Sequence, residues 1–228
     1  MKILSAILTM LLFVSISFAQ ETRTLDAFSE VSAQAGVNVI LASGSQNKAT
    51  IEVENCSPDD IITEVKGGEL TVKFKSNLGM QTRGRKAIVT VQYSGTLEAI
   101  NVSSGAHLEA KNAVEATNLE LGGSSGGMME LKVRAKSLEI GASSGGILSI
   151  EGSTDDLEVD VSSGGMFKAY DLSSLKAEAD ASSGGVANFT VTEELTAEAS
   201  SGGTISYMGK PKSVNIDSGF SGSIKSKD

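Results

Sequence analysis

The sequence is poor in the residues from which disulfides, catalytic sites and metal sites are usually assembled. Cys56 is the only cysteine among 228 residues, so no intrachain disulfide can form and stability must come from packing. A lone cysteine in a β-rich stretch is expected to be a small buried hydrophobe. His107 is the only histidine, and a Ser-His-Asp triad, a Cys-His pair or a zinc site is therefore difficult to build.

Aromatic and basic residues are also scarce. Aromatic side chains make up 4% of the chain, and 28 acidic residues outnumber the 19 lysines and arginines. Proteins that bind nucleic acids need a basic surface to neutralise phosphates, and those that bind single strands also need aromatic platforms on which bases stack. We therefore expect no nucleic-acid partner.

Long apolar runs are confined to the first twenty residues. Lys2 is followed by an apolar stretch from Ile3 to Phe18, and small residues around Ala19 offer a cleavage site. This pattern predicts a signal peptide over residues 1–20. A membrane anchor is the alternative, but the run is short and diluted by serine and threonine. We expect an exported protein (periplasmic, surface-located or secreted) that does not span the membrane once the signal is removed.

What the chain has in abundance is a repeated tetrapeptide. Ser-Ser-Gly-Gly occurs five times, a near copy starts at Ser103, and a decayed copy is expected at Asp217–Phe220. The starts of the seven copies step by 21, 19, 19, 20, 18 and 17 residues. A repeat of this length cannot bury an apolar face alone and must stack on its neighbours, so the period predicts a solenoid.

The residues on either side of each tetrapeptide alternate between apolar and polar. Leu138-Glu139-Ile140 precedes one copy, and apolar residues at the second and fourth positions, such as Leu148 and Ile150, follow it. Such alternation predicts strands with one buried face. Two short strands and two corners per coil of about 19 residues describe an all-β fold, a right-handed parallel β-helix, over residues 96–228.

The tetrapeptides are expected to form the corners of this solenoid. Glycine permits a positive φ at a sharp bend and leaves room for the corner of the next coil. An alternative is a stripe of hydroxyl groups that binds sugars or ordered water. The predicted structural corners include Ser124, Gly126, Ser143, Gly145, Ser162, Gly164, Ser182, Gly184, Ser200 and Gly202. His107 follows the first corner, in a column held by Met128 and Ile147 in later coils, so we expect it to pack rather than to catalyse.

Residues 21–95 carry no copy of the tetrapeptide. Four alternating stretches predict short strands there: Val37–Leu41, Thr50–Val53, Leu70–Phe74 and Ile88–Val91. We interpret this region as a small antiparallel β module that caps one end of the solenoid. Without a cap, the terminal coil would leave an open pairing edge.

Taken together, the apparent signal peptide, the N-terminal strands and the coils with Ser-Ser-Gly-Gly corners at Ser124, Ser143, Ser162, Ser182 and Ser200 resemble a known family. This is the auto-transporter adhesin head family, or GIN domain, which is common in secreted proteins of Bacteroidetes-type bacteria. The resemblance covers about residues 28–213. It implies a right-handed parallel β-helix with a role at the cell surface, and it supplies no catalytic residues.

Acidic residues recur at fixed distances before the corners. Glu120, Glu139, Glu158 and Glu178 lie four residues before a corner, and Asp160 and Asp180 lie two before. If the coils stack in register, these side chains form a ladder in which neighbouring charges repel by about 0.9 kcal/mol even in water. A divalent cation such as Ca²⁺ could relieve the repulsion. The alternative is a solvated acidic face. We expect no other cofactor.

The pattern favours binding over catalysis. The acids recur in columns rather than in one cluster, and no long insertion is present to wall a substrate cleft, so we predict that the protein is not an enzyme. We interpret it as an exported surface or envelope protein that presents a repetitive polar, acidic surface to an extracellular glycan or matrix protein. The alternative is a periplasmic structural or signalling module that binds an envelope protein. Ice binding is disfavoured, because the repeat is Ser-Gly rather than Thr-x-Thr.

Overall fold

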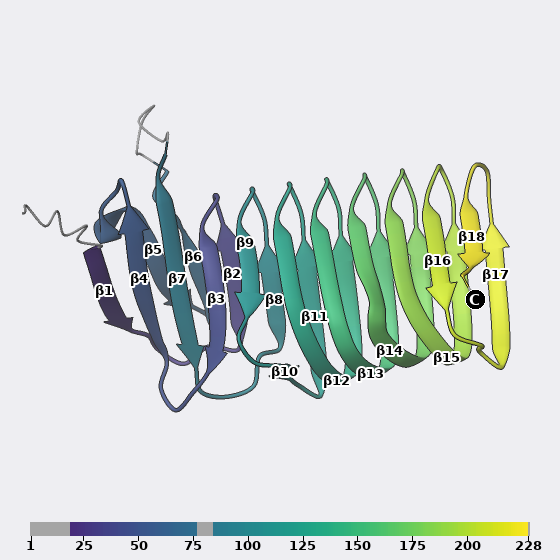
Figure 1. Ribbon diagram of the computed structural model, residues 1–228, viewed down its shortest axis with the longest axis horizontal. Coiled ribbons are helices and arrows are strands. Elements are labelled where there is room, and N and C mark those ends of the chain that lie inside the picture. Colours follow the sequence, from purple (N-terminus) through teal and green to yellow (C-terminus); the bar gives the residue numbers. More distant parts are fainter. Residues whose placement is uncertain (1–18, 77–83, 228) are drawn as a thin grey trace, which may run out of the picture.

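The computed structural model describes residues 19–76 and 84–227, so the predicted signal peptide lies almost entirely outside the described residues. From β8 (Ala99–Val102) to β18 (Ser223–Ser226), successive strands form a stack of coils that advances with a right-handed turn (Figure 1). No helix in these two described ranges is long and apolar enough to cross a membrane.

The coils form two sheets that face each other across one core. The front sheet, nearest the viewer in Figure 1, contains the strands that follow the corners, and the back sheet contains those that precede them. The front sheet comprises β3 (Asn38–Ser43), β7 (Lys86–Tyr93), β9 (His107–Ala110), the first halves of β12 (Met128–Ala142), β13 (Ile147–Val161), β14 (Met166–Ala181) and β15 (Val186–Ala199), then β16 (Thr204–Met208) and β18. The back sheet comprises β2 (Glu30–Gln34), β6 (Glu69–Phe74), β8 (Ala99–Val102), β11 (Asn118–Gly123), the second halves of β12 to β15, and β17 (Ser213–Ser218). The short β10 (Val114–Glu115) pairs with β12 where the chain passes from front to back.

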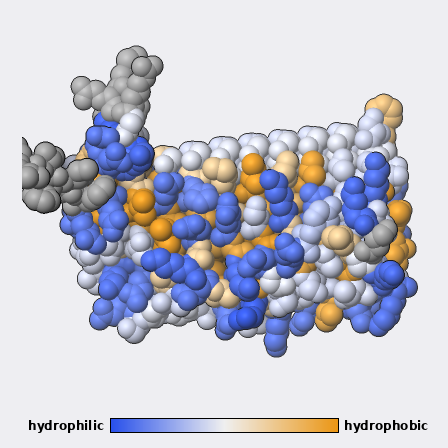
Figure 2. Space-filling view, viewed as in Figure 1, coloured by the Kyte–Doolittle hydropathy of each residue, from blue (hydrophilic) through white to orange (hydrophobic). Residues whose placement is uncertain are grey.

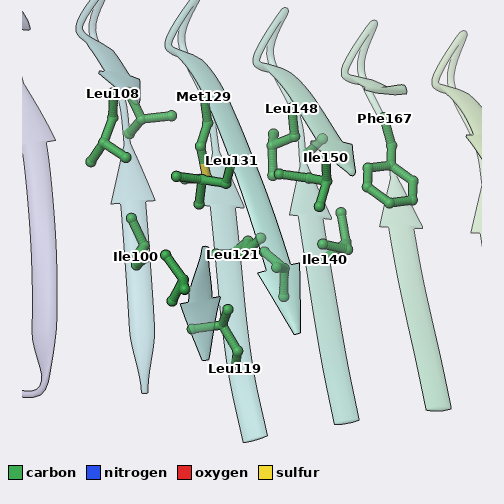
Figure 3. Packing of buried hydrophobic residues seen from close by; sticks show 14 of the residues in the cluster. Ile100, Leu108, Leu119, Leu121, Met129, Leu131, Ile140, Leu148, Ile150 and Phe167 are labelled. Atoms are coloured by element: carbon green, nitrogen blue, oxygen red, sulfur yellow. The ribbon is translucent and has the colours of Figure 1, made fainter. Parts of the chain in front are cut away.

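Equivalent residues of successive coils pair in parallel register. Leu138 pairs with Leu157, which pairs with Ala177 in the next coil. The inward side chains therefore form stacked rows (Figure 3). Each fully buried large apolar side chain contributes about 1.5–3 kcal/mol.

Large and small core residues are exchanged between neighbouring coils. Phe167 lies beside Ala187, and Ala169 lies beside Phe189, with all four side chains at most 2% exposed. Because two phenylalanines would not fit side by side in this narrow core, the exchange keeps the packed volume nearly constant from coil to coil.

The corners divide their task among the four residues of the tetrapeptide. In the corner at 162–165, Ser163 has φ +50° and Gly164 has φ +72°. A Cβ on the fourth residue, Gly165, would overlap the carbonyl of Ala142 in the preceding coil. The third residue thus needs glycine for its conformation and the fourth for close stacking. The same pair of positive φ values recurs at the corners starting at Ser103, Ser124, Ser143, Ser182 and Ser200.

The N-terminal end differs from the antiparallel module that the sequence predicts. The prediction is confirmed for the pairing of β4 (Lys48–Glu54) with β1 (Ala19–Thr24) and β7, and of β5 (Ile61–Lys66) with β6, all of which are antiparallel. The 3₁₀ turn η1 (Pro58–Asp60) lies between β4 and β5. The prediction is wrong for β2 and β3, which pair in parallel with β8 and β9. Between them, Ala35 at φ +57° and Gly36 at φ +75° form one more corner of the same kind.

Strands β6 and β7 then stack on the outer side of β2 and β3. The coil that comes first in the sequence therefore lies between two coils that come later. The antiparallel strands cover the outer end of this arrangement.

In the described part of the chain, the coil of β17 and β18 has a stacked neighbour on one side. Its corner spans 219–222, because Ala199 pairs with Ser218 and Thr204 with Ser223. The expected corner at Asp217–Phe220 is wrong by two residues, since the glycine that stacks closely on the preceding coil is Gly222. Val214 and Ile216 are 46% and 49% exposed, although their partners Leu195 and Ala197 are buried.

Candidate functional site

The predicted acidic ladder forms two columns on the back sheet. We call Glu120, Glu139, Glu158 and Glu178 the glutamate column, and Asp160, Asp180, Glu198 and Asp217 the aspartate column. The members of each column pair with one another in successive coils, and all of them are exposed. The columns lie two residues apart and run side by side on β13 and β14, where Glu158 is followed by Asp160 and Glu178 by Asp180.

The columns repel each other where they come together. The pKa of Asp180 is raised above its ordinary value, first by partial burial and then by the neighbouring charges of Asp160 and Glu178. One cation on the same sheet lies near a carboxylate, with Lys176 Nζ 3.7 Å from Glu194 Oε2. Partial burial and the neighbouring carboxylates of Asp160 and Glu178 therefore disfavour the charged form of Asp180 in the folded chain.

Calcium binding by these columns remains a prediction. Among residues 19–76 and 84–227, no group of three or more histidine, cysteine or acidic side chains is placed to hold a metal ion. A coil contributes at most one outward carboxylate to each column, whereas Ca²⁺ requires six to eight oxygen ligands converging on one point.

The back sheet has a hollow in the coils that precede Asp160, the first residue of the aspartate column. Gly122 and Gly141 occupy the positions that Asp160 and Asp180 take in later coils. A shallow hollow of about 510 Å³ lies over them, next to the corner residues Ser124 and Ser143. The corners themselves form a pale ridge along the upper edge of Figure 2, with the second serine of each tetrapeptide exposed.

The front sheet carries a larger hollow, which we call the front groove. Its volume is about 640 Å³, and it crosses β9 and the first halves of β12 to β15. Figure 2 shows this face, with apolar surface across its middle between charged side chains. The outward side chains that line the groove are those of Glu109, Glu130, Lys132, Ser149, Glu151, Lys168, Tyr170, Asp171 and Asn188.

A β-bulge in β14 places an aromatic ring in this groove. Ala169 and Leu172 are both buried, so the two residues between them, Tyr170 and Asp171, both face outward. The pairing of β13 with β14 shifts by one residue here. Bulges redirect side chains and are common next to functional sites.

Hydrogen bonds from the next coil hold the bulge. The Tyr170 hydroxyl lies 3.1 Å from Asn188 Oδ1, to which it can donate, and Thr190 Oγ1 donates to the Tyr170 carbonyl at 2.7 Å. The tyrosine ring therefore spans the boundary between β14 and β15, and its orientation is fixed at both ends.

Opposite charges face each other across the centre of the groove. Ser149 pairs with Glu130 on one side and with Lys168 on the other. Its short side chain leaves a gap between the carboxylate and the ammonium group. At the lower side of the groove, Lys132 Nζ forms an ion pair with Glu151 Oε1 at 3.2 Å.

Only part of this site follows from the sequence pattern. The alternation predicts that Glu130, Ser149 and Lys168 face outward, which the structure shows. The front groove does not follow from the sequence, because the repeat length varies between coils and one extra residue does not by itself indicate a bulge. The 20-residue step between Ser162 and Ser182 is the signal that could have located it.

His107 lies in the column where the sequence places it, between Asn38 and Met128. Its Nδ1 is buried, with no hydrogen-bond partner in the described part of the chain. Its two strand partners, Asn38 and Met128, are not acidic, so neither can orient the imidazole as a carboxylate orients a general base.

Comparison with known proteins identifies the family. A model of the family described as "Putative auto-transporter adhesin, head GIN domain" matches residues 27–211. The chain belongs to this family. Among curated proteins, no sequence matches.

Solved structures share the fold. A "putative adhesin" from Bacteroides fragilis has a TM-score of 0.75 at 19% identity, covering 93% of this chain and 98% of that one. A second, from Parabacteroides merdae, has a TM-score of 0.71 at 18% identity, covering 92% and 96%. A "putative lipid binding protein" from Parabacteroides distasonis has a TM-score of 0.61 at 19% identity, covering 92% and 97%. At these identities the likeness establishes the fold, and none of the three is described as an enzyme.

Proposed function

We propose that the protein is a non-enzymatic, exported head domain that binds an extracellular ligand, a glycan or a matrix protein, through the outward columns of its coils. The observation that carries this proposal is the register of the columns. Polar groups recur on a rigid surface at a spacing of about 4.8 Å, which suits a ligand that is itself extended or repetitive. Membership of an adhesin-type family supports a location outside the cytoplasm.

A periplasmic module that binds an envelope protein is the second candidate. The outward side chains of Met128, Ile147, Met166 and Val186 follow one another in successive coils, and Met128 is 44% exposed. Exposed apolar side chains in a row are a feature of protein interfaces. This column runs beside the corners on the front sheet.

Protease treatment of intact native cells distinguishes the two candidates. The immunoblot follows this protein and a periplasmic control protein. We expect digestion of this protein while the control stays intact, followed by binding of the purified mature protein to members of a glycan and matrix-protein panel. Full protection from the protease, with co-purification of one envelope protein, would replace the adhesin role by the periplasmic one.

A further inference from the structure

We propose that the front groove is a carbohydrate-binding site, in which one sugar ring lies over Ser149 between Glu130 and Lys168 and packs against Tyr170. The inference rests on the proposed ligand-binding function and gives it a location and a ligand class. It starts from the place where the repeat is broken. The largest outward hollow described above coincides with the bulge that redirects Tyr170 and Asp171.

The dimensions of the groove suit a small ring. Glu130 and Lys168 lie two coils apart, which separates their backbones by about 9.6 Å. Ser149 between them is the smallest outward side chain of this column within the groove. The volume of about 640 Å³ falls in the range of small-molecule sites, about 300–1,000 Å³.

The groups around this gap match the two kinds of surface that a sugar presents. Carboxylates accept hydrogen bonds from hydroxyl groups, the Lys168 ammonium donates them, and the Asn188 amide does both. The apolar C–H face of a pyranose can pack against the tyrosine ring, which is 37% exposed. Because the Tyr170 hydroxyl is held by Asn188, the ring is fixed before a ligand arrives, and less entropy is lost on binding.

Other ligand classes fit the groove less well. An acyl chain requires an enclosed apolar channel, whereas charged side chains line this open hollow. A bare cation would meet the ammonium groups of Lys132 and Lys168. A polyhydroxylated ligand uses donors and acceptors of both signs, and a carboxylated sugar would additionally pair with Lys168.

The test uses the mature protein and an oligosaccharide array that holds plant cell-wall, mucin-type and bacterial cell-wall glycans. The best-bound oligosaccharide is then titrated by calorimetry into the wild type and its variants. Tyr170→Ala removes the ring, and Ser149→Ile fills the gap with a good strand former. Tyr170→Phe keeps the ring, and Lys66→Ala, on β5 of the cap, serves as a distant surface control. Thermal melts establish that each variant is folded.

We expect Tyr170→Ala to weaken binding by about ten- to thirty-fold, as for an aromatic anchor, and Ser149→Ile to abolish it. Tyr170→Phe should retain most of the affinity, and Lys66→Ala all of it. A purely structural role of Tyr170 would lower the melting temperature without this separation of the two tyrosine variants.

Three results would overturn the groove as a glycan site. They are binding to neither glycans nor matrix proteins, binding to a matrix protein but to no glycan, and glycan binding that is lost in Glu158→Gln on the back sheet but kept in Tyr170→Ala and Ser149→Ile. The last two leave the proposed ligand-binding function intact. That function fails only if the protein binds neither glycans nor matrix proteins and is protected from protease on intact cells.

Discussion

The two sheets of the solenoid are built from the same coils but differ in regularity. Across the back sheet, Leu157–Val161 pairs with Ala177–Ala181, and this segment pairs with Leu195–Ala199, without a register shift. Across the front sheet the pairing shifts between Ser149 and Gly152, and again between Ala169 and Ser173. In these coils the extra or missing residues therefore lie between the start of the front strand and the start of the next back strand.

This difference separates two uses of a repeat. Strict register on the back sheet puts like charges in columns, and neighbouring carboxylates raise the pKa of Asp180 in addition to its partial burial. On the front sheet, changes of residue and of length from coil to coil produce a groove with mixed charges and an aromatic ring. Regular stacking thus produces the charged columns of the back sheet, and the irregularities of the front sheet produce the front groove.

Both sheets depend on the corner that joins them, so the largest effect is expected there. Gly165→Ala should lower the free energy of unfolding by about 3 kcal/mol, because its Cβ would overlap the Ala142 carbonyl. The neighbouring Gly164→Ala meets open space and should cost only about 1 kcal/mol for its positive φ. Urea denaturation compares the pair. Equal losses would show that stacking distance does not explain the fourth glycine.

A smaller loss of stability is expected in the segment of β14 that follows the bulge, where the chain leaves the front sheet. Ser174 is fully buried, and its hydroxyl donates to the Thr190 carbonyl at 2.8 Å. Ser174→Ala should therefore cost about 1 kcal/mol. The adjacent Ser173 is exposed, so Ser173→Ala should leave stability nearly unchanged in the same urea titration. A silent Ser174→Ala would mean that the shifted register does not need this hydrogen bond.

The smallest effect is expected on the regular back sheet and depends on pH. Because the pKa of Asp180 is raised above its ordinary value of 3.8, its charged form opposes folding, and this cost disappears as the carboxyl is protonated. Asp180→Asn should raise the melting temperature at pH 7 by on the order of one degree. The gain should vanish below about pH 4.

Glu194→Gln provides the matched control, because this carboxylate has Lys176 beside it and its neutralisation should bring no gain. A rise in melting temperature of the same size for both variants would point to the overall negative charge instead of the contacts of Asp180.

The parts of the fold that could be predicted are those where the local pattern and the stacking agree. Leu138 and Ile140 on one side of a corner and Leu148 and Ile150 on the other have the alternation of a half-buried strand, and each is buried in the structure. In the five Ser-Ser-Gly-Gly corners, the glycines at the third and fourth positions have separate physical requirements, which explains why the tetrapeptide is such a clear marker of the fold.

The parts that were missed depend on long-range pairing. Ala35 and Gly36 form a corner although only the glycine matches the repeat, because β8 and β9 supply the template on which β2 and β3 stack. The insertion of this coil between later ones leaves no local trace. At the other end, Asp217 and Ser218 look like a decayed corner but belong to β17. The front groove follows from a single extra residue, whose effect depends on where the register shifts.

Among the described residues, the coil of β17 and β18 is the least protected, which gives unfolding a direction. In a solenoid, each coil is stabilised by its two neighbours, and a terminal coil lacks one of these interfaces. At the N-terminal end the antiparallel strands replace the missing interface, while Val214 and Ile216 of β17 remain half-exposed at the other end. The backbone amides of β17 and β18 should therefore exchange with solvent first, and opening should proceed coil by coil toward the front groove while the capped end stays closed.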